Sequence, residues 1–168
     1  NLSPCADILV DQNCDVIGDR SFGLTKEVVS EFASSAVRGL QTNNVISCLK
    51  HFPGHGNTSV DSHEDLPVIN DSLDVILDRD IYPFKRAVKS KSAFIMMAHL
   101  KIPAIDENRI TTVSKKAYDL CRNSLKFHGV IITDDMEMGA IEKNYGRVEA
   151  AKMAIQAGAT IVEYRSFE

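Results

Sequence analysis

Five short, continuous apolar runs, separated by segments of helical pattern, constrain the fold of this chain more than any other feature. The runs cover residues 2–10, 45–49, 93–100, 130–133 and 160–162. Strands that are apolar without alternation are typical of a parallel sheet buried on both faces. The sequence therefore predicts an α/β fold in which strands and helices alternate along the chain.

The helical segments carry apolar residues three and four positions apart, and each has a start or stop signal. The expected helices start at Thr25, at Asp71 or Ser72, at Ser114 and at about Arg147. The apolar face of the first reaches Leu40 and that of the second reaches Val88, and the third and fourth end near Gly129 and at Gly158.

Polar clusters follow nearly every apolar run, at residues 11–20, 50–65, 99–106 and 134–137. A (β/α)8 barrel collects its active site on the loops that follow its strands, whereas a doubly wound nucleotide-binding sheet would carry a glycine-rich phosphate motif that this chain lacks. A whole barrel needs about 250 residues, and the chain has 168. We therefore expect residues 1–168 to form one partial domain: an incomplete C-terminal part of a TIM (β/α)8 barrel, about five β-α units without the early strands.

Composition excludes several classes of function. The net charge of −4 argues against a nucleic-acid binder, and no apolar run approaches the roughly 20 residues that span a bilayer. The four cysteines form no C-x-x-C pair and are expected to be buried free thiols, which favours a reducing compartment. We expect a cytoplasmic protein. The alternative is a secreted or cell-surface protein whose signal lies upstream of Asn1.

Asp134 and Asp135 follow the fourth apolar run directly. Two neighbouring carboxylates resist ionising together, and one of them can serve as a covalent nucleophile. The alternative is that these carboxylates cap the helix that follows.

Asp61 and His63 lie two positions apart in a loop rich in glycine and proline. In an extended segment they would point the same way, and the carboxylate could orient an imidazole that exchanges protons near neutral pH. One alternative is a solvated loop histidine. Another is a metal site that uses His51, His55, His63 and Asp61, although Pro53 and Gly54 exclude a helical zinc motif.

Arg20 follows a turn at Gly18 and could bind a carboxylate or sugar hydroxyls, or could form a surface ion pair. Lys50 and His51 end an apolar run, so we expect Lys50 to be more than a solvated charge. His99 is expected to be a buried histidine with its hydrogen bonds satisfied.

Four motifs together resemble the β-N-acetylglucosaminidases of glycoside hydrolase family 3. The resemblance spans residues 2–158 and is carried by IGDRSFG (17–23), KHFPGHGNTSVDSHEDLP (50–67), MMAHL (96–100) and IITDDMEMGAI (131–141).

The resemblance implies a TIM barrel and a role for each matching residue. Asp134 would be the nucleophile, and His63 the general acid and base in a dyad with Asp61. Arg20, Lys50 and His51 would hydrogen-bond sugar hydroxyls. The implied reaction is retaining hydrolysis of terminal β-linked N-acetylglucosamine from glycosides such as muropeptides, with no cofactor and no metal.

The chain departs from the family pattern at three places. It lacks the early strands, with an acidic substrate-binding residue, and it has Gly56-Asn57-Thr58 where the family has G-D-T. Its end, ATIVEYRSFE (159–168), turns polar where the family stays apolar. A phosphorylase, a non-catalytic barrel fragment and a metal-dependent hydrolase therefore stay open as alternatives, and the sequence leaves the oligomeric state open.

Overall fold

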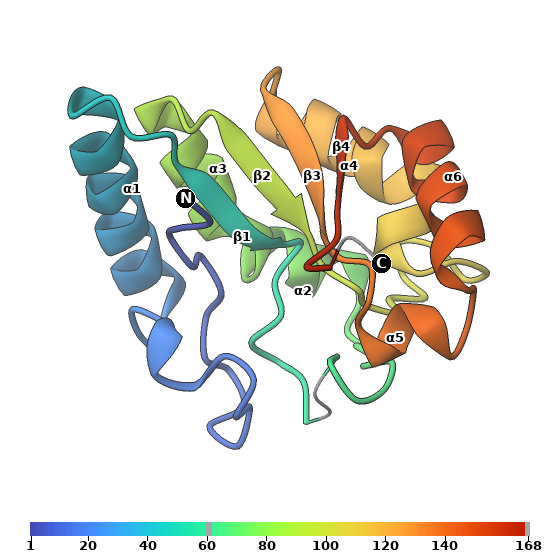
Figure 1. Cartoon of the computed structure of the whole chain (residues 1–168). Helices are drawn as coiled ribbons and strands as arrows, with labels where there is room; N and C mark the ends of the chain where they lie inside the picture. Colours follow the sequence, from blue (N-terminus) through green and yellow to red (C-terminus); the bar gives the residue numbers. More distant parts are fainter. Residues whose placement is uncertain (60–61, 167–168) are drawn as a thin grey trace.

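The computed structural model describes residues 1–59 and 62–166, and within these ranges the centre of the molecule is a four-stranded parallel sheet (Figure 1). The neighbouring pairs along the sheet are all parallel. The strands, in chain order and in sheet order, are β1 (Cys48–Phe52), β2 (Phe94–Met97), β3 (Val130–Asp135) and β4 (Ile161–Glu163). The predicted α/β alternation is confirmed.

The N-terminal apolar run lies along the free edge of β1 but is not the regular strand that we expected. Cys48 N donates to Ser3 O (2.7 Å), Ala6 N donates to Lys50 O (2.6 Å), and Cys5 forms an isolated parallel bridge with Lys50. Pro4 has no N–H to contribute to a ladder. The run therefore extends the sheet only as an irregular edge.

Helices connect the strands, and three of their predicted N-caps are confirmed. The side chains of Thr25, Ser72 and Ser114 accept from the backbone N–H three residues later. The α-helices are α1 (Lys26–Thr42), α2 (Leu73–Asp78), α3 (Ile81–Ala87), α4 (Lys115–Leu125), α5 (Gly139–Glu142) and α6 (Arg147–Ala157), and the 3-10 turns are η1 (Gly18–Arg20), η2 (Val88–Ser90) and η3 (Thr111–Val113).

Two predicted helix boundaries were wrong. The single helix expected to reach Val88 is divided into α2 and α3, because Pro83 lacks an N–H and fits only in the first turn of a helix. The third helix ends at Leu125 rather than near Gly129, because Lys126 adopts the left-handed conformation (φ 53°, ψ 38°). The fourth, α6, ends at Ala157 with Gly158 as its C-cap, as expected.

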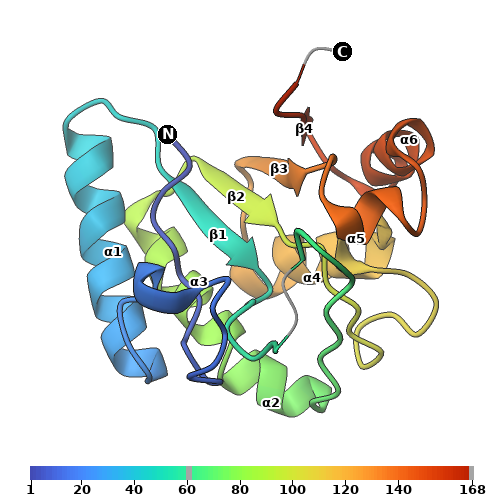
Figure 2. The ribbon, with the colours of Figure 1, turned by 60° about the horizontal axis from the view of Figure 1, so that its bottom comes forward.

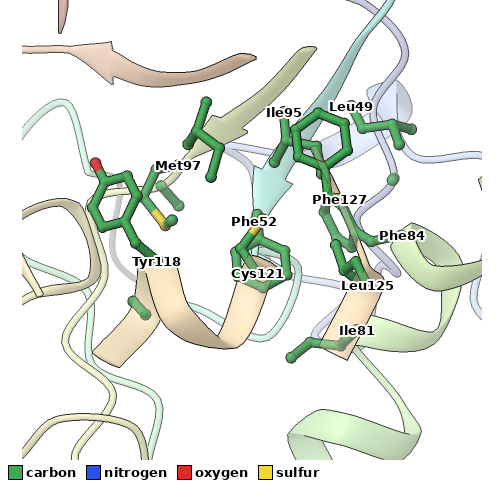
Figure 3. Close-up of a cluster of buried hydrophobic side chains, with 14 of the residues drawn as sticks. Leu49, Phe52, Ile81, Phe84, Ile95, Met97, Tyr118, Cys121, Leu125 and Phe127 are labelled. Carbon is green, nitrogen blue, oxygen red and sulfur yellow. The ribbon is translucent and has the colours of Figure 1, made fainter. Parts of the chain in front are cut away.

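The sheet is apolar on both faces, but helices cover only one of them. Side chains of alternate strand residues, such as Leu49, Ile95 and Ile131, join the main core against the helices (Figure 3). The intervening residues Cys48 and Met96 form a smaller cluster with Ile132 on the opposite, inner face. Figure 1 shows α3 and α4 behind the sheet, with α1 and α6 at its sides. This one-sided arrangement is that of a barrel segment, since a doubly wound sheet has helices on both faces.

The loops after β1 and β3 gather at the carboxyl ends of the strands, which face the viewer in Figure 2. Within residues 1–59 and 62–166, no helix has the length and apolar character needed to cross a bilayer.

Candidate active site

A buried carboxylate, Asp7, organises the first part of the site. It has no exposed surface and lies within the N-terminal apolar run. Asp7 accepts from Nδ1 of His51 (2.7 Å) and from the backbone N–H groups of His51 (3.1 Å) and His55 (2.7 Å). The thiol of Cys5 also donates to it (3.0 Å). We call these four residues the Asp7 cluster.

The Asp7 cluster holds a negative charge away from water. Burial alone would raise the pKa of Asp7, but the charge and hydrogen bonds of His51, together with the Cys5 thiol, lower it well below its usual range. Because a carboxylate can only accept, Nδ1 of His51 must carry the proton that joins them. Sequence reasoning missed Asp7. The available signal was a single acid inside an apolar run.

His55 is almost fully buried and uses both ring nitrogens. Nδ1 lies 3.0 Å from the hydroxyl of Thr58, and Nε2 lies 3.0 Å from the hydroxyl of Ser62. Burial, assisted by His51, lowers the pKa of His55 to about 4. A neutral His55 therefore ties the start of the loop to Ser62, the residue before His63.

Asp134 lies at the carboxyl end of β3, half-buried, as the sequence predicts. Burial would raise the pKa of its carboxyl, but the charges of His51 and His99 outweigh that effect and lower it. The N–H of Asp135, which donates to Asp134 Oδ1 (2.9 Å), and the ammonium of Lys50 add to the lowering. Asp134 is thus held as a carboxylate at neutral pH.

The alternative that these aspartates cap the next helix was wrong. The N-cap of α5 is Met138, with no side-chain cap hydrogen bond. Asp135 instead accepts from the N–H of Glu137 (2.9 Å) within the turn that precedes α5.

His99 is buried and satisfied, as expected. Its Nδ1 lies 2.6 Å from the hydroxyl of Thr112, and its Nε2 lies 2.9 Å from the carbonyl of Asp135. Burial lowers the pKa of His99. The histidine therefore fixes the backbone beside Asp134.

His63 has an exposed side chain in a turn, so the expected extended segment is wrong for residues 62–64. Its predicted partner Asp61 lies outside the described residues. The backbone around His63 docks on the start of α5: Gly139 N donates to His63 O (3.0 Å) and Ala140 N donates to Ser62 O (3.2 Å). Asp134 lies in β3, and the helix that follows this strand, α5, supports the backbone of His63.

Gly139 is required for this docking. A Cβ at that position would lie 2.5 Å from Glu64 O and 2.7 Å from His63 O, closer than such atoms approach. Only a residue without a side chain lets the two backbones meet.

The charges of Lys50 and His51 lower the pKa of the Asp134 carboxyl, so both residues lie near it. Arg20 is placed differently. Its side chain is exposed at the end of η1 and donates to the carbonyl of Val16. A sugar-binding role for Arg20 stays a prediction.

The departure at Asn57 has a structural consequence. Its Nδ2 donates to Asp71 (2.8 Å), which also pairs with Arg79 (2.5 Å). Asn57 thereby fastens the loop after β1 to the residues around α2 and α3.

The metal alternative can be compared with the donors that are present. Among the described residues, ligand atoms of Cys5, Asp7 and His51 lie within 4.8 Å of one another. These atoms already hydrogen-bond to one another, and burial raises the pKa of the Cys5 thiol. In the set suggested by the sequence (His51, His55, His63 and Asp61), both ring nitrogens of His55 already lie within hydrogen-bond distance of hydroxyls. Cys5, Asp7, His51 and His55 therefore already have protein partners for these ligand atoms.

A hollow of about 710 Å³ lies elsewhere, between α1 and the end of α3. Its lining includes Arg38, Arg86 and Lys89 and belongs to the outer layer of helices. We therefore place the site by its chemistry, at the carboxyl ends of the strands.

Known protein families and solved structures are similar to this chain over nearly its whole length. Residues 1–164 match the family "Glycosyl hydrolase family 3 N terminal domain". The chain is 37% identical, over 163 residues, to the beta-hexosaminidase of Nitrosomonas eutropha, and 34% identical, over 167 residues, to the beta-hexosaminidase LpqI of Mycobacterium tuberculosis. Each match covers 96% of this chain, and 46% and 43% of the two relatives. The chain thus spans less than half of their length.

Solved structures show the same relationship. A family 3 β-N-acetylglucosaminidase from Paenibacillus superimposes with a TM-score of 0.95 at 37% identity, over 98% of this chain and 32% of that one. The β-N-acetylglucosaminidase from Thermotoga maritima gives 0.84 at 30% identity, over 97% and 34%. The predicted TIM-barrel-like fold is confirmed, and this chain belongs to the N-terminal domain family of glycosyl hydrolase family 3.

Proposed function

We propose that the complete protein carrying this chain is a retaining β-N-acetylhexosaminidase. Asp134 is its nucleophile, and His63 is its general acid and base, oriented by Asp61. The observation that carries the proposal is the position of Asp134: a half-buried carboxylate at the carboxyl end of β3, whose pKa is lowered although burial would raise it.

In the first step, Asp134 attacks the anomeric carbon of the sugar. The bond from that carbon to the leaving oxygen breaks, and His63 gives its proton to that oxygen. The products are a covalent glycosyl-enzyme and the free aglycone. Because the carboxylate is ionised before the sugar arrives, no proton has to leave it during attack.

In the second step, His63 takes a proton from water and the water oxygen attacks the same carbon. The bond to Asp134 breaks, and the sugar leaves with its original anomeric configuration. One group must act first as acid and then as base, and an imidazole can both donate and accept a proton. Retaining enzymes more often use a second carboxylate for this role.

Lys50, His51 and Arg20 are the proposed partners of the sugar hydroxyls. The Asp7 cluster supports this role for His51, because it fixes the imidazole through Nδ1. Terminal N-acetylglucosamine on peptidoglycan muropeptides, turned over in the cytoplasm, is the substrate and location that we propose. Release of N-acetylglucosamine from a purified disaccharide muropeptide tests the substrate.

The primary test is hydrolysis of an aryl β-N-acetylglucosaminide by the complete protein, with Asp134→Ala and the exposed-surface control Asp74→Ala. We expect Asp134→Ala to lose at least about a thousandfold in kcat and the control to keep it. Added azide should restore turnover of Asp134→Ala and give an α-glycosyl azide, the signature of a lost nucleophile.

The same assay with and without added phosphate distinguishes a hydrolase from a phosphorylase. Free sugar as the product, at a rate independent of phosphate, supports hydrolysis, whereas a sugar phosphate would indicate the phosphorylase. A folded wild-type protein without turnover in either arm would overturn the proposal.

A further inference from the structure

Glu163 is the last residue of β4 and part of the polar end that departs from the family pattern. In β4, Ile161 pairs with Ile132 of β3, the register then shifts, and Glu163 lies opposite Asp135. The preceding residue, Val162, packs against a different cluster, which includes Ile110 and Met136. Ile132 belongs to the inner apolar cluster, so its partner Ile161 and, two residues later, Glu163 lie on the inner face.

Asp134 and Lys50 lie on the same inner face. Each is two residues after a member of the inner apolar cluster, Ile132 in β3 and Cys48 in β1. The three side chains influence one another: burial, Asp134 and Asp135 raise the pKa of Glu163, and Lys50 lowers it. Glu163 is therefore a third charged group at the proposed sugar site.

One side-chain oxygen of Glu163 has no hydrogen-bond partner in the described part of the chain. Within residues 1–59 and 62–166, Oε2 of Glu163 is the buried side-chain oxygen or nitrogen that has no hydrogen-bond partner. Nearly all buried polar atoms in proteins are paired, so an unpaired one calls for an explanation, and a bound ligand is one such explanation. A carboxylate oxygen can only accept, so the missing partner must be a donor.

We propose that Glu163 is a substrate-binding residue that accepts a hydrogen bond from a hydroxyl of the bound N-acetylhexosaminide. The inference rests on the proposed function, because it takes the sugar to lie against Asp134. The hydroxyls of a sugar supply the hydrogen-bond donors that this oxygen lacks. A sugar bound against Asp134 would lie on the inner face of the sheet, where Glu163 also lies. Glu163 would complement the cationic donors Lys50 and Arg20 with an acceptor.

The test compares Glu163→Gln and Glu163→Leu with the exposed control Glu149→Gln in the complete protein. The aryl β-N-acetylglucosaminide and its 3-, 4- and 6-deoxy analogues are the substrates. For the parent sugar we expect KM to rise about tenfold to a hundredfold, the usual range for loss of a charged hydrogen bond, with a smaller change in kcat. For the analogue that lacks the contacted hydroxyl, the variants should match the wild type.

The result that overturns the inference is an unchanged KM for every analogue in a wild type whose turnover depends on Asp134. It is also overturned if Glu163→Gln lowers kcat most for poor leaving groups and azide yields a β-glycosyl azide, because Glu163 would then be the acid and base. Unchanged thermal unfolding of Glu163→Gln excludes a merely structural role.

Calorimetric titration with N-acetylglucosamine separates the two proposals. Binding that Glu163→Gln weakens by a similar factor, in a protein without turnover, would keep the contact and remove the hydrolase. Equal binding by the wild type and Glu163→Gln would remove the contact alone.

Discussion

The Asp7 cluster and the segment of residues 62–65, which we call the His63 segment, serve the same proposed reaction but are held by different forces. Asp7 gathers two backbone N–H groups, an imidazole and a thiol around one buried charge. The His63 segment offers backbone carbonyls to the start of α5, and the His63 side chain is exposed.

The difference is one of free energy. Breaking a pair that includes a buried charge leaves that charge or its partners without compensation, which costs several kcal/mol. A single backbone hydrogen bond contributes about 1 kcal/mol. The surroundings of the nucleophile are therefore fixed firmly, whereas the segment that carries the proton donor is held by contacts that a small change can shift.

The largest expected effect is from Asp7→Ala. It leaves the buried donors of His51 and His55 unpaired, so we expect the free energy of unfolding to fall by about 3–5 kcal/mol. Urea denaturation measures this, with Asp15→Ala, an exposed carboxylate on the same N-terminal stretch, as the control. Equal stability of the two variants would mean that the cluster is not a firm anchor.

The second prediction concerns pH, because His55 joins the two regions through Ser62. The pKa of His55 is about 4 in the folded protein, against 6.5 for histidine in an unfolded chain. The unfolded chain binds a proton first as pH falls, so stability declines from about pH 6.5 to about pH 4, by roughly 3 kcal/mol.

His55→Gln removes this contribution, so its free energy of unfolding should depend less steeply on pH than that of the wild type. The control is the exposed His128→Gln. Burial raises the pKa of Asp80 to about 6, so this residue also contributes to the pH dependence. Asp80 is present in all three proteins, so its contribution cancels when they are compared. Parallel curves for wild type and His55→Gln would contradict the prediction.

The third prediction probes the docking of the His63 segment. Gly139→Ala places a Cβ against the carbonyls of His63 and Glu64, so we expect the segment to shift and kcat to drop about tenfold, or about 1.4 kcal/mol. The control is Gly39→Ala in α1, where an added Cβ meets nothing within 4 Å. An unchanged kcat in Gly139→Ala would show that His63 does not depend on this contact.

The smallest effect is expected from Lys143→Met. Lys143 Nζ donates to Glu64 O (2.5 Å) at the exposed surface, where such contacts are worth about 0.5 kcal/mol. We expect less than about a threefold change in kcat, with Lys85→Met as the matched control. A tenfold loss would place this bond among the firm contacts and would weaken the contrast between the two regions.

Much of the fold was predictable from the sequence because the signals are local. The apolar runs located the four strands along the chain. Thr25, Ser72 and Ser114 marked three helix starts, because a cap depends only on residues within three positions of it. Asp134 was placed at a strand end for the same reason. The division at Pro83 was also readable, but the apolar spacing across it suggested one helix.

The sequence by itself thus determined which elements form and which residue types follow each strand. Tertiary structure alone decided that Asp7 would hold two histidines 44 and 48 positions later, that the start of α5 would support the His63 segment, and that Glu163 would be left with an unpaired oxygen. The physical reason is that burial and long-range hydrogen bonds depend on what packs against a residue, and its sequence neighbours do not specify that.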